Sequence, residues 1–228
     1  VVIPAAGQGK RMGAPINKQF LNLNGIPVLA HCLKVFDVSP YIAEIVVVGA
    51  EEDIPSIERL VAEYRFKKVV SVVKGGKHRQ ESVFAGVKAL GSTIDRVVVH
   101  DGARPLLTLD NFHRFLEKSK GIVAVTTAIP VKDTIKQVDQ AGKVISTLVR
   151  EQLKAIQTPQ LFDRSILEKA HKQAILEGFV GTDDASLVEW LGYPVFVLEG
   201  SSENIKVTTP DDLWVAERIL EQRKIGKE

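Results

Sequence analysis

Short runs of consecutive apolar residues alternate along the chain with longer stretches in which apolar residues recur every three or four positions. Consecutive apolar residues indicate strands that are covered on both faces, as in parallel sheets. The predicted strands are 1–3, 44–48, 68–73, 96–99, 122–128 and 194–197. The helical spacing predicts helices over 28–36, 54–66, 78–90, 109–119, 164–177, 183–191 and 211–223, the last opening with Thr209-Pro210-Asp211-Asp212.

Strand–helix alternation on this scale predicts an α/β fold in which helices cover both faces of a mostly parallel sheet. No linker or repeat divides the chain, so we expect a single domain over residues 1–228. In such three-layer folds ligands bind beyond the carboxyl ends of the strands. The informative loops are therefore those that follow strands.

One segment, at about 132–152, interrupts the alternation. Residues 133–139 and 143–149 read as two strands around a turn that contains Gly142. Ile135, Val138 and Val144 would be exposed on an isolated two-stranded ribbon, which is marginal in water. The hairpin is either a flap on its own subunit or an arm that pairs with a second subunit, and the apolar side chains favour the arm.

Composition narrows the function classes. A net charge of +2 on 228 residues does not by itself indicate a nucleic-acid partner. No apolar run approaches the roughly 18 residues of a membrane helix. The single cysteine, Cys32, excludes an internal disulfide and suits a reducing compartment, so we expect a cytoplasmic protein in which Cys32 fills the core.

The loop after the first strand combines glycines with basic residues. It reads Pro4-Ala5-Ala6-Gly7-Gln8-Gly9-Lys10-Arg11-Met12-Gly13, and Lys18 follows it. The spacing matches neither a Walker loop nor the dinucleotide fingerprint. Small residues let backbone N–H groups approach phosphate oxygens, and three cations stand within reach. The pattern favours a polyphosphate site over a solvated turn.

Two further loops follow predicted strands. Gly75 and Gly76 precede Ser82, a pattern that alone favours a glycine turn with a helix-capping serine over a base- or ribose-binding site. Asp101 comes just past the predicted strand 96–99, at the edge where ligands bind, and an unpaired buried acid there would be costly. A carboxylate beside a triphosphate most often serves Mg²⁺. Arg104 could pair with Asp101 or contact a ligand. A lone histidine at the end of an apolar strand, such as His100, favours a structural role over a catalytic one.

The last part of the chain carries scattered polar residues. They are Arg150, Thr158, Thr182, Asp183 and Lys206. Thr182 and Asp183 could simply cap the helix that follows. On a strand, the ammonium of Lys206 would face away from its apolar neighbours, toward either solvent or a phosphate. Spacing leaves these alternatives open.

Taken together, these blocks resemble the 2-C-methyl-D-erythritol 4-phosphate cytidylyltransferase family of the non-mevalonate isoprenoid pathway. The resemblance spans essentially the whole chain in one order. It rests on residues 4–12, Asn17-Lys18-Gln19, Gly75-Gly76 with Arg79 and Ser82, 99–105, 130–134, 157–160, 181–186 and 204–208. Asn17 departs from the proline that some members have before the lysine.

The resemblance implies a Rossmann-like domain with a protruding β-hairpin arm, assembled as a homodimer. It also implies that CTP and methylerythritol phosphate react, with Mg²⁺, to give 4-diphosphocytidyl-2-C-methyl-D-erythritol and pyrophosphate.

It further implies a role for each matched residue. Catalysis falls to Arg11, Lys18, Arg150 and Lys206. Nucleotide binding falls to Pro4, Ala5, Ala6, Gly7, Gln8, Gly9, Lys10, Gly75, Gly76, Ser82 and Gly102. Substrate binding falls to Asp101, Arg104, Thr134, Thr158, Thr182 and Asp183, with Asp101 also on the metal. Removing Arg11 or Lys18 is then expected to lower turnover roughly 10²–10³-fold, as the loss of one oxyanion-type donor does.

Two alternatives remain. A ribitol 5-phosphate cytidylyltransferase would share the fold, the loop and the mechanism, although the motifs at 100–104 and 182–186 favour methylerythritol phosphate. A non-catalytic nucleotide-binding protein would bind CTP without releasing pyrophosphate, and the presence of Arg11, Lys18, Asp101 and Lys206 argues against it.

Overall fold

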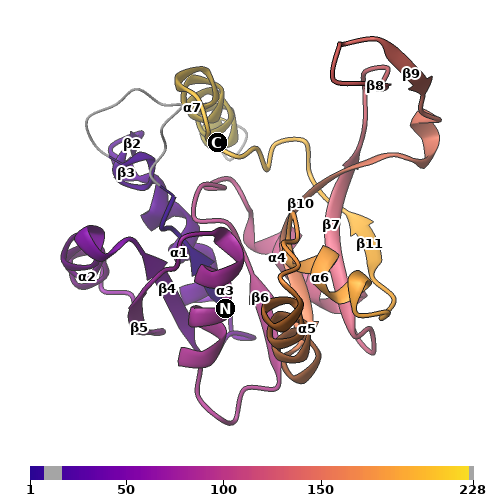
Figure 1. Ribbon diagram of the computed structural model, residues 1–228. Coiled ribbons are helices and arrows are strands. Elements are labelled where there is room, and N and C mark those ends of the chain that lie inside the picture. The colour runs from indigo at the N-terminus through magenta and orange to yellow at the C-terminus, as the bar shows by residue number, and fades with distance from the viewer. Residues whose placement is uncertain (8–16, 226–228) are drawn as a thin grey trace.

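The computed structural model describes residues 1–7 and 17–225, and its centre is a seven-stranded sheet (Figure 1). The strand order is β11-β7-β10-β6-β1-β4-β5. All neighbouring pairs are parallel except the two pairs that involve β10. The strands are β1 (Val2–Pro4), β4 (Ile45–Gly49), β5 (Val69–Lys74), β6 (Arg96–Val99), β7 (Ala124–Pro130), β10 (Lys154–Asp163) and β11 (Phe196–Glu199).

Helices cover both faces of the sheet, so the predicted three-layer α/β architecture is confirmed. One core cluster joins the sheet to α1 (Val28–Val38), α2 (Ile54–Glu63) and α4 (Leu109–Lys118). A second cluster, on the other face, joins it to α3 (Arg79–Ala89), α5 (Arg164–Glu177) and α6 (Asp184–Trp190). The continuous apolar strands β4 and β6 lie between these layers, as their sequences predict.

The strand β10 is one that the hydrophobic pattern does not predict. It carries Gln157, Thr158 and Gln160, whose side chains are almost fully buried, around Pro159. A bulge between Gln157 and Gln160 interrupts its pairing with β7. Polar residues and a proline inside a central strand hide the period-two signal, which explains why this strand is missed.

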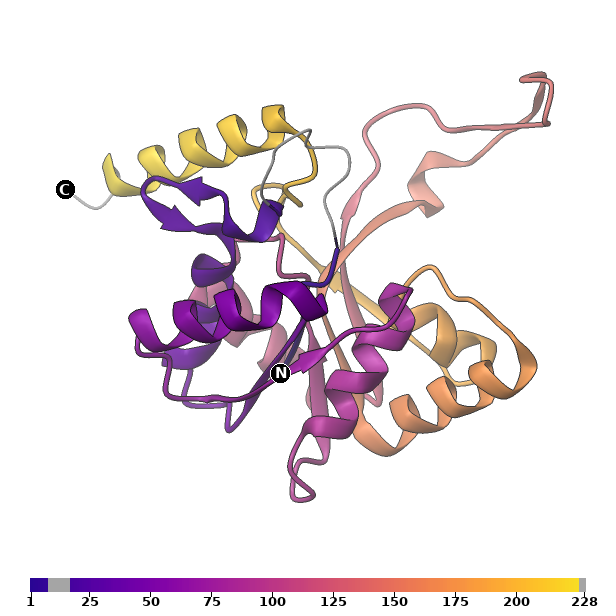
Figure 2. The ribbon, with the colours of Figure 1, turned by 60° about the vertical axis from the view of Figure 1, so that its left-hand side comes forward.

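The hairpin is confirmed as β8 (Lys136–Val138) paired antiparallel with β9 (Val144–Thr147). Gly142 has a φ of +82° in the turn, a conformation that glycine adopts without strain. A short 3-10 helix, η4 (Arg150–Gln152), follows. The hairpin belongs to no other sheet and projects away from the core as an arm (Figures 1 and 2).

A smaller cluster stands at the other end of the molecule. The hairpin of β2 (Asn22–Leu23) and β3 (Ile26–Pro27) lies beside α7 (Pro210–Ile225), as Figure 2 shows. Leu23, Leu106, Val207 and Ala216 are buried between them. Two 3-10 helices, η2 (Lys18–Phe20) and η3 (Glu51–Asp53), precede β2 and α2. Among the described residues, no helix combines the length and the apolar character needed to cross a membrane.

Candidate active site

The carboxyl ends of β1, β5 and β6 open onto a cavity of about 240 Å³. Residues from distant parts of the chain line it, among them 4–7, 76–79, 101–103 and Lys206. The structure thus brings together these residues of the predicted site: Pro4, Ala5, Ala6, Gly7, Gly76, Ser82, Asp101, Gly102 and Lys206. The cavity lies where an α/β sheet of this kind binds its ligands.

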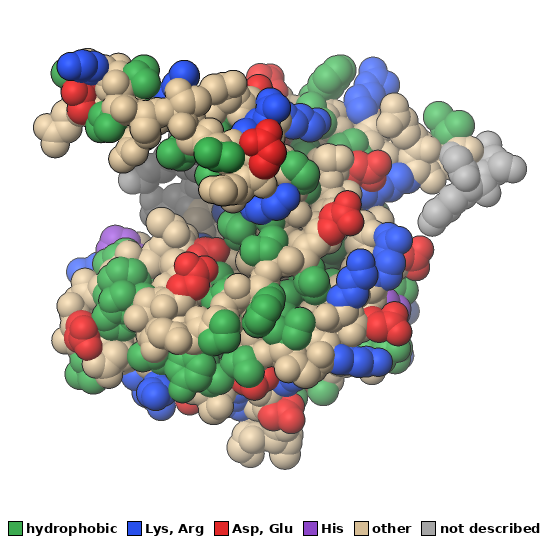
Figure 3. Space-filling model, turned by 90° about the vertical axis from the view of Figure 1, so that its right-hand side faces the viewer, with side chains coloured by type: hydrophobic (Ala, Val, Ile, Leu, Met, Phe, Trp, Pro, Cys, Tyr) green, Lys and Arg blue, Asp and Glu red, His purple; other side chains and the backbone are tan. Residues whose placement is uncertain are grey.

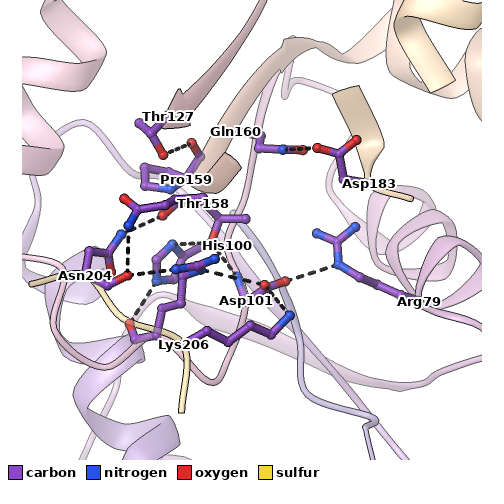
Figure 4. A network of polar contacts seen from close by, with 12 residues as sticks. Arg79, His100, Asp101, Thr127, Thr158, Pro159, Gln160, Asp183, Asn204 and Lys206 are labelled. Atoms are coloured by element: carbon purple, nitrogen blue, oxygen red, sulfur yellow. Dashed lines mark hydrogen bonds and ion pairs between the residues drawn. The ribbon is translucent and has the colours of Figure 1, made fainter. Parts of the chain in front are cut away.

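Asp101 holds the cations of this site together (Figure 4). Its Oδ1 lies 3.1 Å from Nε of Arg79, and its Oδ2 lies 2.8 Å from Nζ of Lys206. Nε of Arg104 approaches Oδ2 at 3.8 Å. Three cations from three parts of the chain therefore converge on one carboxylate that is only 7% exposed.

This surplus of positive charge keeps Asp101 ionised. Burial alone would raise the pKa of Asp101, but Arg79 and Lys206 outweigh it and hold the pKa well below its usual value. Even with Asp184, which also pairs with Arg79, two carboxylates face three cations, and this leaves net positive charge at the cavity. That charge suits an anionic ligand.

Arg79 also joins Asp101 to a second carboxylate. Its Nη1 lies 2.7 Å from Asp184, which is fully buried at the start of α6. The ring of His171, stacked on Phe84, lies 3.5 Å from the other oxygen of Asp184. Burial alone would lower the pKa of Arg79, but the two carboxylates raise it above its usual value. Arg79 therefore remains charged and fixes α3, α6 and the end of β6 relative to one another.

The backbone of Asp101 is held by Thr158. The Asp101 N–H donates to Thr158 Oγ1 at 3.0 Å, and this hydroxyl lies 3.1 Å from His100 Nδ1. His100 is fully buried, with Nε2 3.1 Å from the Arg104 carbonyl, and burial lowers its pKa to about 4. The predicted structural role of His100 is confirmed. Thr158 holds the backbone of Asp101 and does not itself line the cavity.

The two glycines after β5 are required by close packing. A Cβ on Gly75 would come within 2.7 Å of Ser82 Oγ, and one on Gly76 within 2.3 Å of Glu81 Cβ. Ser82 is buried; its hydroxyl donates to the His78 carbonyl and accepts from the Gly76 N–H, both at 3.1 Å. Ser82 lies within the first turn of α3 and accepts from no N–H group of that helix, so the helix-capping role that the motif alone favours is wrong. Its hydroxyl instead fixes Gly76 at the cavity wall.

Lys206 reaches the cavity from an extended loop and not from a strand. The Val207 N–H donates to the Ala103 carbonyl at 2.8 Å, and Arg104 Nη1 donates to the Asn204 carbonyl at 2.7 Å. These two bonds tie the loop to the segment after β6 on either side of Lys206. Its ammonium is therefore directed toward Asp101, not toward solvent alone.

Comparisons with known proteins agree with this geometry. The family model of 2-C-methyl-D-erythritol 4-phosphate cytidylyltransferase (IspD) matches residues 1–222. The protein of that name from Halalkalibacterium halodurans is 50% identical over 224 residues, which are 98% of this chain and 97% of the relative. The chain belongs to this family.

Solved structures of the family share the fold. A 4-diphosphocytidyl-2C-methyl-D-erythritol synthase from Anaerococcus prevotii is 31% identical, with a TM-score of 0.85 over 96% of each chain. The Francisella tularensis 2-C-methyl-D-erythritol 4-phosphate cytidylyltransferase is 33% identical, with a TM-score of 0.80 over 95% of this chain and 97% of that one. Both matches extend over nearly the whole chain.

Of the two neighbouring residues Thr182 and Asp183, the structure assigns only Asp183 a contact with α6. Asp183 accepts from the Ser186 N–H at 2.9 Å in a capping box and from Gln160 Nε2 at 2.7 Å. Thr182 is exposed beside it. The capping role is therefore confirmed for Asp183 and not for Thr182. Neither residue lines the 240 Å³ cavity, and a role of either in substrate binding stays a prediction.

Thr134 and Arg150 lie on the arm. Both are exposed, and Arg150 donates to the Lys132 carbonyl at 3.2 Å and lies 3.9 Å from Glu151. The arm projects away from the central sheet (Figure 1), and neither residue lines the 240 Å³ cavity. Their predicted contact with substrate stays a prediction.

Some predicted residues lie outside the described part of the chain. They are Gln8, Gly9, Lys10 and Arg11, and the side chain of Lys18. The backbone of Lys18 is described as the first residue of η2.

A metal site on Asp101 fits this geometry poorly. No group of three His, Cys, Asp or Glu residues that could hold a metal occurs within 1–7 and 17–225. Both oxygens of Asp101 already face cations, at 3.1 and 2.8 Å. A dication placed beside them would be repelled by three positive side chains. Asp101 fits the role of a holder of cations better than that of a Mg²⁺ ligand.

The roles of Arg79 and Asp184 are missed by sequence reasoning. Arg79 stands in the first turn of α3, and the sequence motif gives it no role of its own. Asp184 is the second of two consecutive acids at the start of a helix, where the first one caps the helix. The available signal is the second acid itself, because one residue suffices to cap a helix. A buried ion pair that joins distant segments leaves no local spacing pattern.

Proposed function

We propose that the chain transfers the cytidylyl group of CTP to 2-C-methyl-D-erythritol 4-phosphate and releases pyrophosphate, a step of isoprenoid precursor biosynthesis. Membership of the family supports the reaction and its substrates. The observation that carries the proposal is the set of cations, Arg79, Arg104 and Lys206, gathered on Asp101 beside a glycine-lined cavity.

The nucleophile is already a phosphate anion, so the chemistry needs no general base. One of its oxygens bonds to the α-phosphorus of CTP, and the bond from that phosphorus to the pyrophosphate oxygen breaks. The barrier is repulsion between two anions and charge gathering on the α-phosphorus. Fixed cations in a partly dry site lower both terms.

Each segment of the site has a task in this proposal. Residues 4–7 and Gly76 with Ser82 receive the nucleotide, because they line the cavity and approach it with backbone groups. Lys206 orients the attacking phosphate, and Arg104 holds the loop that carries it. Arg11 and Lys18 stabilise the charge on the α-phosphate. This last assignment rests on the resemblance alone.

Nucleotidyl transfer from a triphosphate generally uses a metal ion, which stabilises charge on the phosphates. We take this ion to be Mg²⁺, a hard cation that prefers phosphate and water oxygens. Because Asp101 is occupied by cations, the phosphates of CTP are the better ligands, and no step here depends on a metal bound to Asp101.

The arm supports a homodimer. Val138, Val144, Ile145 and Val149 on the arm are each at least half exposed. Seen from the side of β11 and the arm, hydrophobic side chains gather on the surface of the molecule (Figure 3). Apolar side chains on an isolated two-stranded ribbon need a partner surface. In a dimer, Thr134 and Arg150 of one subunit would complete the substrate pocket of the other. We place this dimer in the cytoplasm.

The test is pyrophosphate release by the purified chain with CTP, ATP, GTP or UTP and either methylerythritol phosphate or ribitol 5-phosphate. The proposal expects release with CTP and methylerythritol phosphate far above every other pair. Faster release with ribitol 5-phosphate would reassign the acceptor. Binding of CTP without any release would make the chain a nucleotide-binding protein and reject the enzyme.

A further inference from the structure

A single carboxylate oxygen of Asp53 accepts hydrogen bonds from the residues on both sides of Lys18. Oδ2 of Asp53 accepts from the side-chain amide of Asn17 at 2.7 Å and from that of Gln19 at 2.9 Å. The Phe20 N–H donates to the Asn17 carbonyl at 2.9 Å and closes the turn over Lys18. The backbone of Lys18 is thus held from before and after.

Asp53 does not cap the helix that follows it, although its position suggests that role. It precedes α2 directly, where an aspartate commonly accepts from the first helical N–H groups. Here its side chain makes no such bond to α2 and turns to residues 17 and 19 instead. Asp53 is 8% exposed and Gln19 2%, so this contact is well shielded from water.

The contact also ties η2 to the ligand-binding edge of the sheet. Asp53 ends η3, shortly after β4, and its N–H donates to the Ala50 carbonyl at 3.0 Å. Gln19 itself lines the 240 Å³ cavity. A hydrogen bond to an ionised acceptor is about twice as strong as a neutral one. Asp53 therefore anchors the turn of Lys18 to a rigid strand end beside the cavity.

We infer that Asp53 is a positioning residue for the cytidylyl transfer, which sets the backbone of Lys18 through the amides of Asn17 and Gln19. The inference rests on the proposed function, which gives Lys18 its task at the α-phosphate. A displacement of about 1 Å in a catalytic group can cost on the order of 10²-fold in rate. A flexible lysine side chain depends on a fixed Cα to reach one phosphorus, so loosening its turn lowers turnover.

The test is a double-mutant cycle on kcat, with Asp53→Ala, Lys18→Ala and the double variant. We expect Asp53→Ala to lower kcat on the order of 10²-fold and Lys18→Ala roughly 10²–10³-fold. The double variant should fall within about threefold of Lys18→Ala, because Asp53 acts only through Lys18. Two effects that multiply in full would assign Asp53 a merely structural role and overturn the inference.

Matched variants sharpen the cycle. Asp53→Asn keeps an oxygen that can accept both amides, so it should recover most of the lost rate. Asp37→Ala removes a comparable contact to the Lys68 N–H, 2.8 Å long, away from the cavity. It should leave kcat near that of the wild type. If Asp53→Ala does not fold, Asn17→Ala removes one of the two bonds and must show the same lack of additivity with Lys18→Ala.

A second readout separates this inference from the proposed function. Amide hydrogen exchange at residues 17–20 should quicken in Asp53→Ala, whatever reaction the chain performs. Wild-type protein that releases no pyrophosphate would reject the function while this measurement still tests the contact. Unchanged exchange, or quickened exchange with an undiminished kcat, would overturn the positioning role.

Discussion

The carboxylate of Asp101 and the ammonium of Lys206 lie 2.8 Å apart, although one follows a strand of the sheet and the other lies in a loop near the end of the chain. This pair brings the two halves of the site together. Asp101 thus serves to place positive charge at the cavity, and its own negative charge is largely cancelled by its neighbours.

Asp101→Asn should therefore act on the cations and not on a metal. The amide keeps the shape of the side chain but holds Lys206 and Arg79 less firmly, so we expect kcat to fall roughly 10²-fold. The Mg²⁺ concentration that gives half of the maximal rate should stay within about threefold of that of the wild type. A steady-state titration with Mg²⁺ measures both. A much higher Mg²⁺ requirement would restore Asp101 as a metal ligand.

Arg79 should be indispensable because it neutralises a fully buried carboxylate. Arg79→Ala leaves Asp184 unpaired, and we expect the free energy of unfolding to fall by about 3–5 kcal/mol. Adding Asp184→Asn should recover part of that loss, since the amide carries no charge to bury. Urea unfolding of the single and double variants checks this. A double variant no more stable than Arg79→Ala would show that the loss does not come from the unpaired charge of Asp184.

The arm can be tested by mixing two inactive variants. Arg150→Ala should inactivate the site that the arm reaches, and Lys206→Ala the site of its own chain. If the sites are shared across a dimer, a mixed dimer holds one intact site. Refolding the two variants together at equal ratio should then restore about a quarter of the wild-type rate.

The control for that experiment is each variant refolded alone, which should stay inactive. No recovery in a mixture shown to contain mixed dimers would place Arg150 in the site of its own chain. A monomer in sedimentation experiments would remove the dimer from the proposal altogether.

Burial of His100 predicts a pH dependence of stability. Its folded pKa of about 4 lies below the unfolded value, so the unfolded chain binds the proton first as the pH falls. The free energy of unfolding should therefore drop by about 3 kcal/mol between pH 6.5 and pH 4. His100→Gln should show a shallower slope across this window in urea titrations. An identical slope in the variant would assign the dependence to other groups.

The sequence predicts most of the layers and much of the cavity, for a physical reason. Strands buried on both faces need consecutive apolar residues, and loops that approach phosphates need glycine, so β4, β6 and the residues around Gly7 and Gly76 carry local signals. The predicted helix boundaries lie within three residues of the observed ones, and helix ends commonly vary by this much.

Other features depend on contacts that have no local signature. The strand β10 is polar because Gln157 and Gln160 are paired inside the fold, with Ser201 and Thr126 among their partners. The ion pair of Arg79 with Asp184 joins residues whose spacing in the sequence is arbitrary. Such contacts arise from topology, so only the folded structure reveals them.

Whether cations held at the cavity promote the transfer is tested most directly by the kcat of Lys206→Ala, measured by pyrophosphate release with saturating CTP and methylerythritol phosphate. Lys172→Ala, which removes an exposed lysine on α5, is the matched control. If cations held at the cavity stabilise the developing charge, Lys206→Ala should lose roughly 10²–10³-fold while the control keeps the wild-type rate. A kcat of Lys206→Ala within about twofold of the wild type would show that the Lys206 ammonium does not stabilise the developing charge.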